Sequence, residues 1–144
     1  MAKIRGLEGR DVSLDDTMVQ ELRAALEGAL LVPGDKGYDE ARTIWNGMVD
    51  RRPALVARCA SAGDVVKAVG FARQSGALVS IRGAGHHIAG NSVVEGGLTI
   101  DLSTMRGIDL DAASGIVTVG PGATLGDLDA ATGPAGWAVR CLRH

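Results

Sequence analysis

The chain has 144 residues, of which 46% are hydrophobic and 22% charged, and its formal net charge is −2. This length suits one domain, and the apolar content argues against wholesale disorder. The weak negative charge argues against nucleic acid as a partner, which would need a clustered basic face. Two cysteines, Cys59 and Cys141, are too few and too far apart for a disulfide framework or a zinc site. No stretch approaches the ~18 apolar residues of a membrane span, and residues 1–14 lack a signal peptide's apolar core, so we expect a cytoplasmic protein with no membrane partner.

Glycine and the aromatic residues depart from ordinary composition. There are 21 glycines, roughly twice the usual share, but only two Trp, one Tyr and one Phe. The core must therefore be built from small aliphatic side chains. The glycines are clustered and show no period, which indicates tight turns or close approach of the backbone to a ligand.

Residues 1–32 are predicted to form an N-terminal helical segment. A capping box at Ser13–Asp16 opens it, and an apolar stripe with helical spacing runs over residues 14–29. A shorter helix is predicted over residues 39–48.

The middle of the chain is predicted to form a strand–helix–strand unit. A strand over residues 54–59 leads into a capping box at Ser61–Asp64, and the helix that follows ends at Gly76, a typical C-cap glycine. A second strand covers residues 77–82. Such crossovers are nearly always parallel and right-handed.

Beyond residue 90 the pattern changes to that of an antiparallel half. Residues 97–102 form a strand with clean alternation, and residues 107–111 and 116–119 form a hairpin. A short helix follows with Thr124 as its N-cap. The overall class is therefore α+β.

A glycine-rich segment, Arg82–Asn91, directly follows the second strand of the crossover. Consecutive exposed N–H groups on such a turn can bind an anion, and Arg82 could add a charge-assisted contact. The segment is not a Rossmann fingerprint, because the third glycine would fall at Ile88, and the Gly-Lys-Ser/Thr of a P-loop is missing. A turn without any ligand would have the same composition. The adjacent His86 and His87 favour a functional site, whereas a metal site lacks the further ligands it would need.

Several linked motifs resemble a known family. The segment Arg82–Asn91, followed by residues 96–106 and 117–128, looks like the PCMH-type FAD-binding domain of bacterial berberine-bridge-enzyme-like FAD-linked oxidases, in the vanillyl-alcohol-oxidase superfamily. Residues 38–42, 45–46 and 52–56 also look like that branch. The resemblance runs from about Val32 to Trp137 in the same order as in the family.

The resemblance implies a two-lobed α+β domain that holds FAD between its lobes. The FAD-binding domain would cover residues 33–144, with a βαβ lobe at about 53–106 and a second, more antiparallel lobe at about 107–139. Full-length members transfer a hydride from a substrate C–H bond, here an alcohol or carbohydrate-like one, to flavin, which oxygen reoxidises. The implied cofactor-binding residues are Arg82, Gly83, Ala84, Gly85, His86, His87, Gly90, Asn91, Gly120 and Gly122.

His86 occupies the position that is often bonded to the flavin 8α-methyl group in this family. Ala84 stands where the family usually has glycine, which is tolerable if its φ is negative. Asp101 is expected to organise a turn, and Cys59 to be a buried small hydrophobe. Trp45 and Trp137 are expected to be packing anchors.

The end of the chain departs from the family. Residues 140–144 form a non-family tail in place of a second flavin loop and a substrate domain, so we expect a truncated relative in which no catalytic base can be named. A small-molecule substrate would then need the missing region. Cys141 is read as incidental, although some members carry a second, cysteinyl flavin link near this distance from His86. The alternative is a non-catalytic remnant that forms homo-oligomers or binds a nucleotide-like ligand.

Overall fold

The computed structural model describes residues 2–139. Its largest element is a four-stranded sheet with the order β3-β4-β6-β5, in which β3 is antiparallel to β4 and the other neighbours are parallel. The strands are β3 (Ala29–Leu31), β4 (Leu55–Arg58), β5 (Val79–Arg82) and β6 (Leu98–Asp101).

The predicted crossover unit is present. α3 (Ala62–Ser75) connects β4 to β5, begins at Ser61, whose side chain accepts from the Asp64 N–H, and ends at Gly76 with φ of 66°. β4 and β5 run parallel, but β6 lies between them. The strand expected over residues 97–102 is therefore central, and all four of its residues are buried. The strand itself is confirmed, but it belongs to the parallel sheet and not to the antiparallel half, because it pairs in parallel with β4 and β5.

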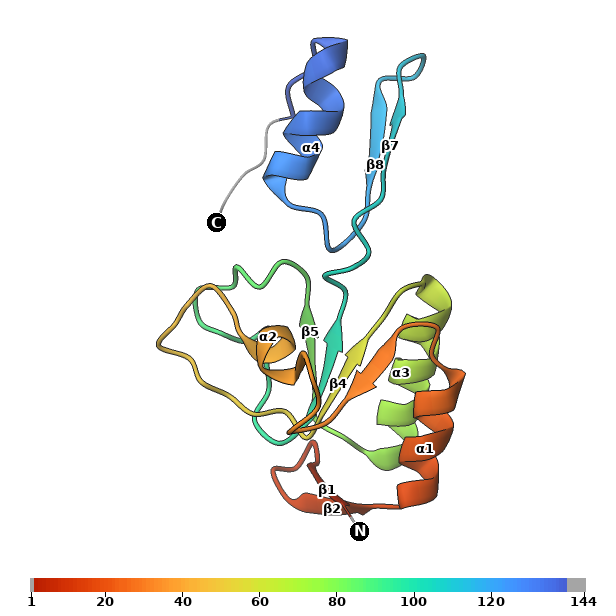
Figure 1. Cartoon of the computed structure of the whole chain (residues 1–144), viewed down its shortest axis with the longest axis vertical. Helices are drawn as coiled ribbons and strands as arrows, with labels where there is room; N and C mark the ends of the chain where they lie inside the picture. The colour runs from red at the N-terminus through yellow and green to blue at the C-terminus, as the bar shows by residue number, and fades with distance from the viewer. Residues whose placement is uncertain (1, 140–144) are drawn as a thin grey trace.

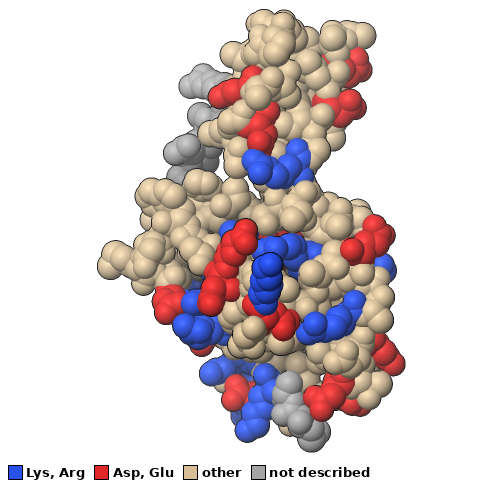
Figure 2. Space-filling model, viewed as in Figure 1, with Lys and Arg blue, Asp and Glu red and all other residues tan. Residues whose placement is uncertain are grey.

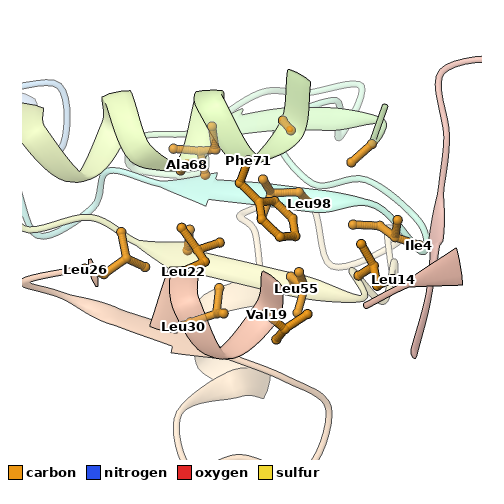
Figure 3. Close-up of a cluster of buried hydrophobic side chains, with 14 of the residues drawn as sticks. Ile4, Leu14, Val19, Leu22, Leu26, Leu30, Leu55, Ala68, Phe71 and Leu98 are labelled. Carbon is orange, nitrogen blue, oxygen red and sulfur yellow. The ribbon is translucent and has the colours of Figure 1, made fainter. Parts of the chain in front are cut away.

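Two layers cover the sheet. α1 (Asp16–Ala25) packs beside α3 on one face, and α2 (Tyr38–Arg42) lies on the other (Figure 1). Aliphatic side chains fill the larger interface, with one aromatic ring from Phe71 among them (Figure 3). On the opposite face Tyr38 is buried and donates its hydroxyl to Pro53 O at 2.6 Å.

The N-terminal segment contains more strand than predicted. β1 (Ala2–Arg5) and β2 (Asp11–Leu14) form an antiparallel hairpin before α1. The N-cap of α1 is Asp15, not Ser13, and the helix ends at Ala25, so residues 29–31 are free to pair with β4. An ideal Cβ on Gly28 would lie 2.0 Å from Arg58 O, so this glycine permits the close approach of the two strands.

The second helix is also shorter than predicted, since α2 stops at Arg42. Thr43 is extended, and its hydroxyl donates to Asp39 O at 2.6 Å. Ile44 is buried, but Met48 is 94% exposed and lies on no helix.

A smaller second lobe projects from the sheet (Figure 1). It consists of the predicted hairpin of β7 (Ile108–Asp111) and β8 (Ile116–Val119), then α4 (Leu125–Thr132) and a 3₁₀ turn over Gly133–Ala135. Thr124 is the N-cap of α4, as predicted, and forms a reciprocal capping box with Asp127. The parallel sheet and this antiparallel lobe together confirm the two-lobed α+β architecture.

Candidate functional site

The glycine-rich segment leaves the carboxyl end of β5 and passes beside the start of the second lobe. Gly85 and Gly90 have φ values of 77° and 72°, which favour glycine, whereas no described residue other than glycine has positive φ. Ala84 therefore fits without strain. An ideal Cβ on Gly83 would lie 2.6 Å from Pro121 O, so the structure brings the first glycine of the segment against the Gly120–Gly122 turn.

The backbone N–H groups of this segment are free. Within the described chain, no hydrogen bond is donated by the backbone of residues 83–89, and the next donor is Gly90, which bonds His87 O at 3.0 Å. Seven consecutive N–H groups thus have no partner in the described chain, and of these residues Gly85 is buried while residues 86–89 are exposed. Such an arrangement can bind an anion through backbone dipoles.

The carbonyl groups, in contrast, fix the segment to the loop that follows α2. Trp45 N–H donates to Gly85 O at 3.0 Å, and the Asn46 side-chain amide donates to Ile88 O at 2.8 Å. Arg51 Nη1 holds the far end by donating to two carbonyl oxygens, those of Gly90 and Val93, each at 2.9 Å. The free N–H groups therefore belong to a fixed loop.

Arg82 is engaged by the protein itself. Its Nη1 donates to Asp101 at 2.9 Å and its Nη2 to Thr43 O at 3.1 Å, while its Nε is buried and has no partner within the described residues. The fully buried Asp101 also accepts from Arg58 Nε at 3.3 Å and from Ser103 N–H at 3.1 Å. The expectation that Asp101 organises the turn is confirmed. A direct contact of Arg82 with a ligand stays a prediction.

Gly120 and Gly122 lie where two chain segments connect the lobes. Ideal Cβ atoms on them would lie 2.3 Å from Met105 O and 2.2 Å from Leu102 O. Their N–H groups donate to Gly107 O and Met105 O, respectively. These glycines are needed for close packing, and they place the second lobe beside the glycine-rich segment.

Both histidines are exposed, and so is Asn91. Neither imidazole has a hydrogen-bond partner in the described part of the chain. No group of three metal-ligating side chains occurs within residues 2–139.

Two further single-residue expectations have different outcomes. Cys59 is fully buried, as expected. The pKa of its thiol is raised to about 11, mainly by burial and to a smaller extent by the negative charges of Asp64 and Asp101. Trp45 is not a packing anchor, because it is 70% exposed. Cys141 lies outside the described residues.

A polar pocket that the sequence did not indicate lies at the carboxyl edge of the sheet. It measures about 460 Å³ and is lined by Glu40, Arg58, Arg82, Ser103, Thr104 and Arg106. Basic side chains are visible where the lobes meet (Figure 2). Ligands of α/β sheets commonly bind outside the carboxyl ends of the strands. Arg58 and Arg82, near the carboxyl ends of two predicted strands, were the sequence feature that could have indicated this pocket.

A family model described as an FAD-binding domain matches residues 53–142, more than half of the chain. The chain belongs to this FAD-binding domain family. The β4–α3–β5 unit, β6, the glycine-rich segment and the second lobe are all inside the matched range, which confirms the resemblance found in the sequence. No helix of this FAD-binding domain within residues 2–139 has the length and apolar character to cross a membrane.

Individual relatives support the same assignment. The chain is 39% identical over 104 residues to (R)-6-hydroxynicotine oxidase of Paenarthrobacter nicotinovorans, covering 72% of this chain and 23% of the oxidase. The crystal structure of 6-hydroxy-D-nicotine oxidase from Arthrobacter nicotinovorans matches with a TM-score of 0.76 at 35% identity, covering 86% of this chain and 26% of that one. Physcomitrella patens BBE-like 1 matches with a TM-score of 0.75 at 27% identity, covering 82% and 26%. The chain thus spans about a quarter of the length of these FAD-linked relatives.

The FAD-binding domain has features that fit FAD. A pyrophosphate offers anionic acceptors, and residues 83–89 offer a run of donors without partners in the described chain. The pocket at the lobe junction adds arginines next to that turn.

Proposed function

We propose that residues 83–89 bind the pyrophosphate of FAD through their backbone N–H groups. The observation that carries this proposal is the run of seven consecutive amide donors without partners in the described chain. No Asp, Glu, Lys or Arg occurs in residues 83–94, so the attraction there would come from oriented backbone dipoles rather than from side-chain charge. The same feature leaves no carboxylate within this segment to repel the phosphates.

The second lobe would then complete the cradle. The close approach of Pro121 O to Gly83 places the Gly120–Gly122 turn at its edge, and Arg58 and Arg106 border the pocket beside it. Arg106 is held by a bidentate pair with Asp127, at the first turn of α4. These residues would orient the cofactor between the lobes.

His86 is proposed as the point of covalent attachment. It is exposed and has no competing partner in the described chain, so its imidazole is free to react. Attachment would replace one hydrogen of the flavin 8α-methyl group by an imidazole nitrogen. That hydrogen and the imidazole N–H hydrogen would leave as protons, and the electron pair left on the flavin would pass with two protons to oxygen, which would become hydrogen peroxide.

The proposed activity of the whole enzyme is oxidation of an alcohol or carbohydrate-like C–H bond. FAD, when bound, supplies a hydride acceptor that oxygen can reoxidise. The part of this work done by the chain itself is to bind and orient that group, because it spans about a quarter of its relatives. We assign no catalytic base within it.

The test is a visible absorption spectrum of the purified protein, followed by flavin fluorescence on a denaturing gel. A yellow protein with a fluorescent band that is lost in His86→Ala and kept in His87→Ala supports both binding and attachment. Yellow colour released on denaturation supports binding and rejects attachment. A colourless protein that takes up no added FAD rejects the proposed function.

A second candidate function is self-association without turnover. The β7–β8 ribbon pairs with no further strand in the described chain, and Ile116 and Val119 on it are 60% and 42% exposed. Unpaired strand edges with apolar side chains promote pairing between molecules. A colourless oligomer in sizing chromatography would favour this candidate, and a flavin-loaded monomer would favour FAD binding.

A further inference from the structure

An uncharged apolar surface lies next to the free N–H groups. Among the described large apolar side chains, five are at least 70% exposed, and three of these are Trp45, Met48 and Ile88. Residues 43–49 and 83–94 contain no Asp, Glu, Lys or Arg. In the space-filling view the two loops form a projection on the left that carries no charged side chain (Figure 2).

The exposure of Trp45 does not come from a loose loop. Its own N–H is bonded to Gly85 O, and the next residue, Asn46, is bonded through its side chain to Ile88 O and caps the turn by accepting from Met48 N–H at 3.1 Å. Val49 packs so closely on Gly90 that a Cβ there would approach to 2.7 Å. The indole is thus presented to solvent by a backbone that is fixed at both ends.

The position of Trp45 relative to His86 is set by the hydrogen bond from Trp45 N–H to Gly85 O. Gly85 is the residue before His86, and the Ile44 Cα lies 3.6 Å from the ideal Cβ position of Gly85. The indole of Trp45 and the imidazole of His86 therefore belong to two loop segments whose backbones lie next to each other. A ligand whose anionic part occupies the amides of residues 83–89 has this apolar surface as its neighbour.

We propose that Trp45 stacks on the flavin ring of FAD and so contributes the affinity that distinguishes FAD from its ADP half. This inference rests on the proposed function. Indole presents a large rigid π-face, and stacking of aromatic rings contributes beyond the area buried. Met48 and Ile88 extend the same surface with a flexible thioether and an aliphatic side chain, which suits an uncharged ring edge.

The experiment measures reversible binding of FAD and of ADP to the full chain. His86→Ala serves as the background in all proteins, so that no covalent bond removes FAD from the equilibrium. Into it are placed Trp45→Ala, Trp45→Phe and, as the matched control, Trp137→Ala in the second lobe. Because Trp45 is 70% exposed, its truncation leaves no core cavity, and urea unfolding checks that each variant is folded.

We expect Trp45→Ala to weaken FAD binding about three- to tenfold with no change for ADP. Trp45→Phe should keep most of the affinity, but the emission of bound flavin should rise because a contacting indole quenches it. Trp137→Ala should change neither ligand. An unchanged ratio of FAD to ADP affinity in Trp45→Ala overturns the stacking while leaving the amide cradle intact. Loss of ADP binding in the background protein itself overturns the cradle and the stacking together. Dissociation of an oligomer by Trp45→Ala with an unchanged ratio assigns the surface to a second copy and rejects the proposal.

Discussion

Arg82 Nη1 lies 2.9 Å from Asp101 Oδ1, which joins the last residue of β5 to the last residue of β6. Arg58, at the end of β4, reaches the same carboxylate from the other side. One buried acid therefore connects the carboxyl ends of three parallel strands. The glycine-rich segment begins at the next residue after Arg82, so this ion cluster determines where the free amides start.

Replacing Asp101 by alanine should destabilise the fold by about 3 kcal/mol, because it leaves two arginines without their buried counter-charge. The free energy of unfolding from urea titration is the measurement. Asp109→Ala, at an exposed position of β7, is the control and should change stability by less than about 0.5 kcal/mol. Equal stabilities of the two variants would contradict the assigned role of Asp101.

Gly83→Ala should lower the free energy of unfolding by about 2 kcal/mol, because the new methyl would lie 2.6 Å from Pro121 O and must push the two segments apart. It should also weaken FAD binding by separating the lobes. Gly70→Ala is the matched control, since this position in α3 is open within 4 Å and alanine favours a helix by about 1 kcal/mol. Similar effects of the two substitutions on stability would show that the lobes do not depend on this contact.

The sequence was most informative where a local signal and the tertiary contact agree. Ser61 and Gly76 delimit α3 as predicted, and Thr124 caps α4, because capping is determined by bonds within a few residues. It failed at residues 29–31, whose aliphatic side chains continue a helical stripe but pair with β4 instead. Gly28 was the overlooked signal for the end of the helix.

In the candidate site, too, the features that depend on local sequence were predicted and those that depend on tertiary contacts were not. Clustered glycines predicted a thinly covered turn, and its free amides follow from that composition. The pairing of Arg82 with Asp101 could not be predicted, because it depends on β6 being placed between β4 and β5. The exposure of Trp45 was also unpredictable, since an aromatic residue in an aliphatic sequence is ordinarily buried.

Cys59 should resist alkylation in the folded protein. Burial raises the pKa of its thiol to about 11, and the reactive thiolate is therefore scarce near neutral pH. In a Cys141→Ser variant, where Cys59 is the one remaining thiol, iodoacetamide at pH 8 should react at least about 100-fold more slowly before unfolding than after it in urea. Mass spectrometry of timed samples measures the rate, and rapid labelling of the folded protein would show that the residue is accessible.

Asp64 should make stability depend on acid pH. Burial alone would raise the pKa of this carboxyl, but donors from Ala60, Glu27 and Gly28, together with Lys67, lower it to about 2. Because the pKa is lower in the folded state, the ionised carboxylate stabilises the protein at pH values above the unfolded-state pKa, which is near 4. This contribution is lost as the pH falls towards 2. It should amount to about 2 kcal/mol at neutral pH.

The measurement compares urea unfolding of the unaltered protein with that of Asp64→Asn between pH 7 and pH 3. An asparagine cannot accept all three amide donors with a charged oxygen, so the variant should be less stable at pH 7, and the difference should shrink below pH 4. Asp129→Asn, at an exposed position of α4, should show no such convergence. A constant difference between the unaltered protein and Asp64→Asn over the whole range would mean that the carboxylate charge does not stabilise the junction between the N-terminal segment and the start of α3.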